Sequence, residues 1–146
     1  MTTSVAISTI LHHKGNKVWT ISPGATVFDA IRLLAEKNIG ALPVVEGDKV
    51  IGIFSERDYT RKVALAGKTS QKTLVREIIS TDVVSGTPHN TVEECMRLMT
   101  EKRVRHLPIL EEGKLAGLIS IGDLVNWTIS AQDATIAQME SYLAGR

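Results

Sequence analysis

The chain repeats itself once, and this repeat constrains its fold more than any other feature of the sequence. When the sequence is aligned with itself at an offset of 65 residues, 14 of the 36 positions from Pro23 to Asp58 are identical to their partners between Pro88 and Asp123, without a gap. Ten of the other 22 pairs match an apolar residue with an apolar residue. Two copies rather than many indicate a pseudo-two-fold pair and not a solenoid.

Each copy predicts the element order β-α-β-β-α, so the expected fold class is α+β, with two repeats related by a pseudo-two-fold axis. The opening β-stretches are expected at 17–21 and 82–85. The helices that follow begin at the N-caps Thr26 and Thr91, the second with a capping box. Their apolar residues follow the spacing of a helix that lies on a core, which places the single cysteine, Cys95, inside.

A β-hairpin and a second helix complete each copy. The hairpin strands are expected at 41–45 and 50–54, then at 107–110 and 115–119, with Pro43 and Pro108 at strand starts, where a missing N–H is tolerated. The second helices open at Ser55 and Ser120.

These elements predict four parts of the chain. Residues 1–66 form the first repeat with an N-terminal extension, 67–80 a linker, 81–131 the second repeat and 132–146 a C-terminal helix. An apolar stripe along the last part is expected to pack on its own chain or on a partner subunit: Ile129, Ile136, Met139 and Leu143.

Composition narrows the possible partners. Lys and Arg total 17 against 16 for Asp and Glu, a net charge of +1, so no single-sign field favours nucleic acid or an anionic membrane. The longest apolar runs are too short for a membrane span, and the start of the sequence does not resemble a secretion signal. With one cysteine, a cytoplasmic protein is expected.

One motif occurs in both copies: Gly52-Ile-Phe-Ser55-Glu-Arg-Asp58 and Gly117-Leu-Ile-Ser120-Ile-Gly-Asp123. In each, a serine starts a helix and an aspartate follows one turn later. The carboxylate is able to accept hydrogen bonds from two adjacent ribose hydroxyls. The alternative is that Ser-x-x-Asp only caps the helix, and both roles can hold together.

The repeat length, the element order and these motifs resemble a tandem pair of CBS domains, the Bateman module, as found in small stand-alone bacterial proteins. The resemblance covers the chain from about Val5 to Ile129. It implies a regulatory role in which adenosine-containing ligands such as AMP, ADP, ATP, NAD or S-adenosylmethionine act as signals. It also implies a homodimer, a regulated partner protein and no catalytic cofactor.

The resemblance implies two clefts between the repeats. Ribose and phosphate contacts are expected from the motif residues and nearby cations: Ser55, Arg57, Asp58, Ser120, Asp123, Arg103, Arg105 and His106. An adenine slot is expected from the first β-stretch and the hairpin start of a repeat: Val18, Trp19, Thr20, Ile39, Gly40, Ala41 and Pro43, then Thr81, Asp82, Val83, Val84, Val104 and Pro108. Because the cations differ between copies, the two sites are expected to be inequivalent.

Less specific interpretations stay open for these residues. The side chains of the expected adenine slot could simply fill the core. Arg103 and Arg105 could lie on a solvated strand face, and His106 could be a structural histidine. The function then has two alternatives: a structural or interaction module with vestigial sites, or an enzyme. No set of residues offers a nucleophile with a base or a metal site, so we expect no enzyme and no metal.

Overall fold

The computed structural model describes residues 5–15 and 17–143; the outer limits expected for the first and last parts, residues 1 and 146, lie outside them. The first repeat comprises α2 (Val27–Lys37), β1 (Ala41–Glu46), β2 (Lys49–Ser55), α3 (Glu56–Asp58) and the π-helix η2 (Tyr59–Ala64). The second comprises α4 (Val92–Lys102), β3 (His106–Glu111), β4 (Lys114–Ser120) and α5 (Ile121–Leu143). The short helices α1 (Ile7–Lys14) and η3 (Val75–Glu77) precede the two repeats. The α+β class and the twofold repeat are confirmed.

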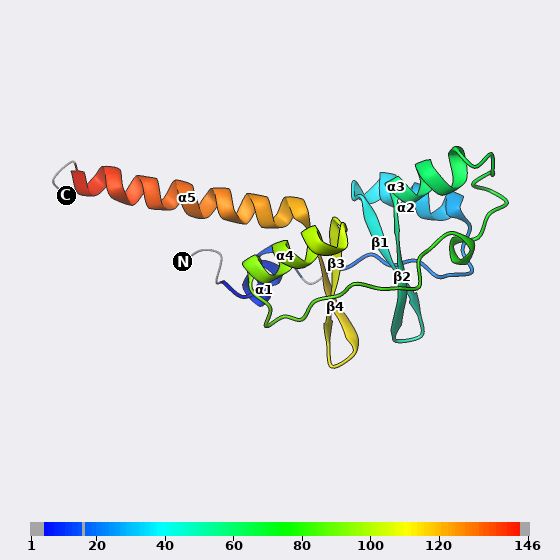
Figure 1. Ribbon diagram of the computed structural model, residues 1–146, viewed down its shortest axis with the longest axis horizontal. Helices are drawn as coiled ribbons and strands as arrows, with labels where there is room; N and C mark the ends of the chain where they lie inside the picture. The colour runs from blue at the N-terminus through cyan, green and yellow to red at the C-terminus, as the bar shows by residue number, and fades with distance from the viewer. Residues whose placement is uncertain (1–4, 16, 144–146) are drawn as a thin grey trace.

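The two hairpins form as predicted and lie side by side (Figure 1). In the first, β1 pairs antiparallel with β2, Leu42 opposite Phe54; in the second, Leu107 stands opposite Ile119. These four side chains are fully buried. The helix starts are also confirmed, since Thr26 Oγ1 accepts a hydrogen bond from the Asp29 N–H at 3.1 Å, and Thr91 and Glu94 form a capping box.

The opening β-stretches are much shorter than predicted. Only Ile21 pairs with β1, opposite Val44, and only Gly86, one residue beyond the predicted 82–85, pairs with β3. The reason lies in the two prolines, which stand inside their strands and not at the starts. The Pro43 carbonyl accepts a hydrogen bond from the Ile21 N–H at 3.0 Å. The Pro43 nitrogen faces the same edge of β1 but carries no hydrogen, so the ladder toward the earlier residues stops there. Pro108 ends the pairing of Gly86 in the same way.

Each repeat completes its core with a segment from outside it. The linker before the second repeat docks on the first: the Val27 N–H donates to the Thr73 carbonyl at 2.8 Å, and Val75 donates to Ala25 at 2.9 Å. Val75 and Ile78 are buried in the first core. Residues 73–79, expected within a linker, are therefore part of the first repeat's packing.

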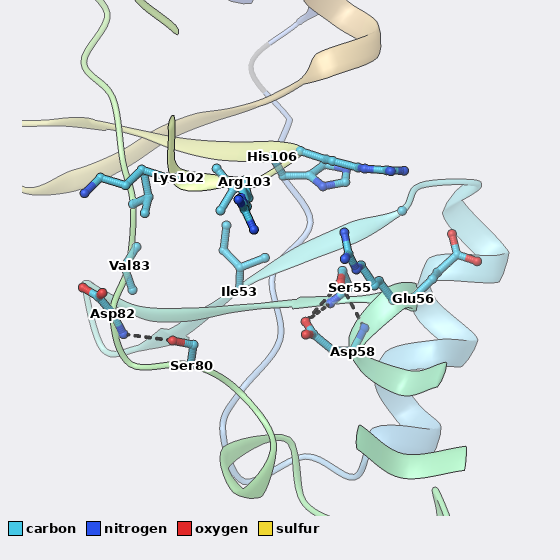
Figure 2. A pocket seen from close by; sticks show the side chains of 15 residues that line it. Ile53, Ser55, Glu56, Asp58, Ser80, Asp82, Val83, Lys102, Arg103 and His106 are labelled. Carbon is cyan, nitrogen blue, oxygen red and sulfur yellow. Dashed lines mark hydrogen bonds between the residues drawn. The ribbon is translucent and has the colours of Figure 1, made fainter. Parts of the chain in front are cut away.

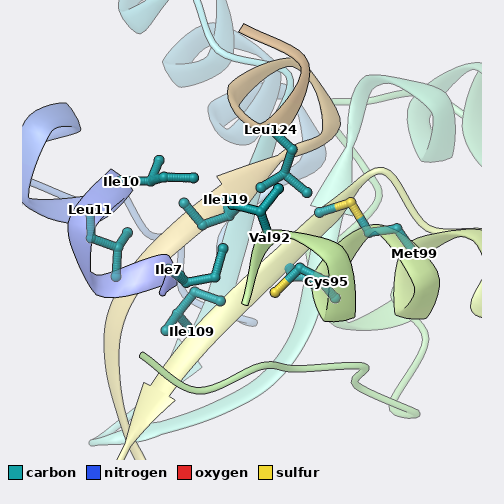
Figure 3. Close-up of a cluster of buried hydrophobic side chains, with 10 residues drawn as sticks. Ile7, Ile10, Leu11, Val92, Cys95, Met99, Ile109, Ile119 and Leu124 are labelled. Atoms are coloured by element: carbon teal, nitrogen blue, oxygen red, sulfur yellow. The ribbon is translucent and has the colours of Figure 1, made fainter. Parts of the chain in front are cut away.

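The N-terminal segment makes the reciprocal contact. Ile7 donates to the Asn90 carbonyl at 2.8 Å, and Val92 donates to Val5 at 3.0 Å. Figure 3 shows the α1 side chains among those of α4, β3, β4 and α5. The extension grouped with the first repeat in the sequence thus packs on the second.

Two glycines let these segments approach the hairpins. A Cβ at Gly52 of β2 would lie 2.8 Å from Ile79 Cδ1 and 3.0 Å from the Ser80 carbonyl oxygen, and one at Gly117 of β4 would lie 2.5 Å from a Leu11 methyl group. Real Cβ atoms do not come this close, so glycine at both motif positions has a packing reason.

Helix α5 runs without a break across the division expected at residue 131. Its first two turns pack on the second core through Leu124 and Trp127, and the rest extends away from the body (Figure 1). In the part of the chain that the structure describes, no helix has the length and apolar character needed to cross a bilayer.

We expect Gly52→Ala to lower the free energy of unfolding by about 1–3 kcal/mol, because the added methyl group presses on the fixed Ser80 backbone. Gly122→Ala is the matched control: its Cβ would meet only Ser120 Oγ at 3.6 Å, and alanine favours the helix there by up to about 1 kcal/mol. Urea unfolding measures both. Equal stability of the two variants would contradict the close approach of residues 79–80.

Candidate functional site

A cleft of about 580 Å³ lies between the two repeats, with one wall from each (Figure 2). The first repeat supplies the hairpin and motif side: Gly40, Ile53, Ser55, Glu56, Arg57 and Asp58. The junction of α4 with β3 lies opposite and supplies Lys102, Arg103, Val104, Arg105 and His106. The segment between the repeats runs beside β2 at one end of the cleft and supplies Ser80, Asp82, Val83 and Val84. The cleft thus exists only where both repeats are present.

Asp58 is held in place by the start of its own helix. Its Oδ2 accepts hydrogen bonds from the Ser55 N–H at 2.9 Å and from the Ser55 hydroxyl at 3.0 Å, while its own N–H donates to Ser55 Oγ at 3.2 Å. The helix-capping interpretation is therefore confirmed. Oδ1 lies 3.5 Å from Lys62 Nζ, and the Asp58 side chain keeps 22% exposure. A preorganised carboxylate with one oxygen outside the capping box faces the cleft.

Part of the cleft lining is apolar. Val83, Val84 and Val104 line it together with Ile53 of β2. The Pro108 nitrogen faces the segment that precedes Gly86 but carries no hydrogen. The ladder hydrogen bond that it would donate to the Val84 carbonyl is therefore missing. The lining therefore combines aliphatic surface with backbone polar groups that the sheet does not use.

Four cationic residues line the cleft: Arg57 from the first repeat, and Lys102, Arg103 and Arg105 from the second. Arg103 ends α4 with φ 56° and ψ 43°, a left-handed conformation that a non-glycine residue other than Asn or Asp rarely adopts. The corresponding residue of the first repeat is Asn38, at φ 53° and ψ 50°. An arginine thus occupies a backbone position for which asparagine is the better residue.

His106 stands at the start of β3, where the repeats meet. Its ring would lie 3.6 Å from a Cβ placed on Gly40 of the first repeat. Burial lowers the pKa of His106, and the charges of Lys14 and Arg105 lower it further against the opposing charge of Asp123. The ring is therefore neutral at pH 7 and able to act as a donor or an acceptor.

The second motif has the same capping geometry but a different neighbour. The Ser120 N–H donates to Asp123 Oδ2 at 2.8 Å, and the Asp123 N–H donates to Ser120 Oγ at 3.1 Å. Lys14, the last residue of α1, reaches the same oxygen at 2.7 Å and also donates to the Leu118 carbonyl at 2.8 Å. The carboxylate of the second repeat therefore already has a cationic partner from the N-terminal segment.

The surroundings of Asp123 act on its ionisation in opposite directions. Burial raises the pKa of Asp123 and is the largest single influence. The hydrogen bonds from Lys14 and Ser120, with the charge of Lys14, together outweigh it and hold the pKa below its ordinary value. Asp123 is thus a stable carboxylate that a ligand would share with Lys14.

The structure brings eleven of the residues named from the sequence into this one cleft: Ser55, Arg57, Asp58, Arg103, Arg105, His106, Gly40, Asp82, Val83, Val84 and Val104. It combines the motif of the first repeat with slot residues of the second. The remaining ones do not line it: Ser120, Asp123, Val18, Trp19, Thr20, Ile39, Ala41, Pro43, Thr81 and Pro108. Trp19, for instance, packs on the first core beneath the ammonium groups of Lys17 and Lys37.

Four lining residues were not named from the sequence: Ile53, Glu56, Ser80 and Lys102. Ile53 and Glu56 lie within the motif, so its span contained a signal for them. To predict that Ser80 and Lys102 line the cleft, one would need to know how the linker runs past the first repeat. Cys95 is in the second core, and burial raises the pKa of its thiol to about 11, which agrees with the packing role expected for it.

Comparison with known proteins places the chain among CBS-domain proteins. The CBS domain model matches residues 8–65 and 75–130. The CBS domain-containing protein YhcV of Bacillus subtilis is 36% identical over 118 residues, which cover 81% of this chain and 84% of that protein. A putative signal-transduction protein with CBS domains from Burkholderia ambifaria is 49% identical, with a TM-score of 0.84 over 88% of this chain and 96% of that one.

A more distant solved structure shares the fold. The CBS domain pair of protein MJ0100, in complex with 5′-methylthioadenosine and S-adenosyl-L-methionine, is 20% identical, with a TM-score of 0.76 over 87% of this chain and 98% of that one.

We expect Lys14→Met to raise the pKa of Asp123, because the burial stays while the strongest opposing contacts are lost. Carboxyl NMR titration measures the change, and Lys17→Met, whose ammonium lies over Trp19, is the control. The ion pair is partly exposed, so its contribution to stability is at most about 1 kcal/mol. That contribution is complete above the unfolded aspartate pKa of about 3.9 and disappears as the pH falls through the lower folded value. An unchanged Asp123 pKa would contradict the contact.

Proposed function

The chain belongs to the CBS domain family, whose model matches both repeats, and on that premise we propose that it is a regulatory module that senses adenine nucleotides. The ligands are AMP, ATP or NAD-type compounds, bound in two inequivalent clefts between the repeats and not chemically changed. The observation that carries the proposal is the cleft in which the Asp58 carboxylate faces aliphatic and cationic groups of the other repeat.

The chemistry of the walls divides the cleft into three parts that fit the three parts of a nucleotide. Asp58 Oδ1 lies outside the capping box and accepts from ribose hydroxyls. The aliphatic surface of Ile53, Val83 and Val104 takes the adenine ring, with the free backbone at Val84 for its polar edge. Arg103 and Arg105 bind phosphate oxygens, for which the planar guanidinium is suited.

The chemical class of the ligand has support from the MJ0100 pair, whose two ligands both contain adenosine. Those ligands carry no phosphate, whereas the cleft here is lined by Arg57, Lys102, Arg103 and Arg105. The same lining contains three carboxylates, Glu56, Asp58 and Asp82, so the cations exceed them by one charge. This balance favours a phosphorylated nucleotide over an uncharged nucleoside in this chain.

The second cleft is the one that contains Asp123. A ligand there has to share or displace Lys14, which is already hydrogen-bonded to the carboxylate. A displaced ammonium remains next to the ligand and pairs with a negative group on it. The two clefts therefore differ in affinity and in preferred nucleotide, as the different cations of the two copies led us to expect.

Binding in a cleft with one wall from each repeat ties the repeats together and shifts the population of their arrangements. A partner protein then reads that arrangement, and two copies of the chain associate as a homodimer. The main alternative is a structural or interaction module whose clefts are vestigial. Catalysis forms no part of the proposal, because the groups that line the cleft have binding and capping roles.

A panel of AMP, ADP, ATP, NAD, NADH and S-adenosylmethionine tests the proposal by thermal shift and calorimetry. A ligand at 100 times its dissociation constant stabilises the folded state by about 2.7 kcal/mol. Asp58→Asn is expected to weaken binding in the first cleft about tenfold, since it removes the charge but keeps an oxygen for the Ser55 N–H. Arg32→Gln, in an exposed ion pair on α2, is the control. Stabilisation by no nucleotide would favour the vestigial alternative.

Arg103→Asn introduces the residue of the first repeat and is expected to have two opposite effects. Stability rises by up to about 1 kcal/mol, because asparagine suits the left-handed backbone. Affinity for AMP and ATP falls several-fold, because a phosphate partner is lost, while affinity for adenosine stays the same. Calorimetry with the three ligands and urea unfolding measure both effects. Unchanged AMP affinity would remove Arg103 from the site.

A further inference from the structure

The outer part of helix α5 is an arm with an uncovered apolar face. The helix is 23 residues long, and the CBS domain model ends at residue 130, inside it. Beyond the first turns the arm extends away from both repeats (Figure 1). A lone helix gains little stability from its backbone in water, so an arm of this length needs a packed face.

Five apolar side chains follow the arm along one line, which we call the seam: Val125, Ile129, Ile136, Met139 and Leu143. All are exposed, from 41% for Val125 to 84% for Leu143. Their spacings are four, seven, three and four residues, so they fit the alternation of four and three that marks the core positions of a coiled coil. Isoleucine or leucine then stands at each a position, and valine and methionine stand at two of the three d positions.

The seam has one polar position, because the step of seven residues passes over Gln132 at the middle d position. This side chain is exposed. In a parallel pair in register it meets the same glutamine of a second helix, and the two amide groups are able to donate to and accept from each other. A polar residue in the core of a coiled coil lowers its stability and restricts its register. Gln132 therefore weakens the pairing of two seams without preventing it.

The seam does not face the body of its own chain. Leu124 is the side chain of α5 that is fully buried in the second core. Each residue turns the helix by about 100°, which places the centre of the seam about a quarter turn away from Leu124. The body therefore leaves the seam open even at Val125 and Ile129.

Charge distinguishes between the possible occupants of the seam. Residues 121–143 contain no lysine or arginine, so the arm lacks the basic face with which amphipathic helices bind anionic membranes. The pattern instead complements itself, because β-branched residues at a favour two-stranded packing and the glutamine at the polar position is its own partner. We propose that the arm pairs with α5 of a second copy of the chain as a two-stranded coiled coil.

The length of the seam sets the strength of this contact. From Val125 to Leu143 it spans about 27 Å, which is less than three heptads. Such a pairing is reversible and depends on concentration. It gives the proposed homodimer an interface on the arm and does not rest on nucleotide binding.

Analytical ultracentrifugation of the full chain over a dilution series tests the proposal. The parent is expected to dimerise, and Ile129→Asp with Ile136→Asp to weaken the dimer at least tenfold. The matched control places the same two charges one residue further on, at the exposed Ser130 and Ala137, and is expected to dimerise like the parent. Gln132→Leu makes the seam apolar throughout and is expected to tighten the dimer several-fold. Circular dichroism is expected to show helix loss on dilution of the parent.

Four results would overturn the pairing of the arms. The first is a parent protein that is monomeric at all concentrations, and the second is an aspartate variant of the seam that dimerises like the parent. The third is a control variant that loses the dimer as the aspartate variant does. The fourth is a Gln132→Leu variant that dimerises no more tightly than the parent. The second result leaves the homodimer proposal standing, with its interface on the repeats. Calorimetry with AMP on the aspartate variant separates this question from the ligand proposal, because the cleft does not include α5.

Discussion

The reciprocal docking of residues 73–79 on the first repeat and of residues 5–11 on the second holds the molecule together. Neither hairpin with its helices buries a full core alone, because Val75 and Ile78 belong to one core and Ile7, Ile10 and Leu11 to the other. The chain that leaves the first core at Ile79 must then pass along β2. It lines one end of the cleft at Ser80 and at residues 82–84. The shape of the cleft is thus a consequence of how the cores are completed.

The same docking makes the two motifs different. On the second repeat the docked segment is a helix, α1, that carries Lys14 to Asp123. On the first repeat it contains the short helix η3, which ends at Glu77, and the chain then lines the cleft at Ser80 and at residues 82–84. His106 lines the Asp58 cleft, and its pKa responds to Lys14 and Asp123. A change of charge at Asp123 therefore acts on a side chain that lines the Asp58 cleft.

Periodicity, capping residues and the internal repeat were sufficient to predict helices α2 and α4, both hairpins and the capping role of Ser55 and Asp58, but not the helix α1. The effect of Pro43 and Pro108 on strand pairing was harder to predict. It depends on which edge of the hairpin each proline nitrogen faces, and that is known only once the segments at Ile21 and Gly86 are placed beside the hairpins. The sequence also led us to group each repeat with its own slot residues, whereas the cleft joins Asp58 to Val83 and Val84. That exchange depends on long-range packing around Gly52, and local spacing contains no signal for it. The contact of Lys14 with Asp123 has no local signal for the same reason.

The measurement that tests the central claim most directly is an NMR titration of the isotope-labelled full chain with AMP and ATP. A nucleotide in a cleft shared by the repeats shifts the amide resonances of Ser55 and Asp58 in the first repeat together with those of Val83 and Val104 in the second. These shifts saturate along one binding curve. Shifts confined to a single repeat, or none at these four residues at saturating nucleotide, would contradict the account.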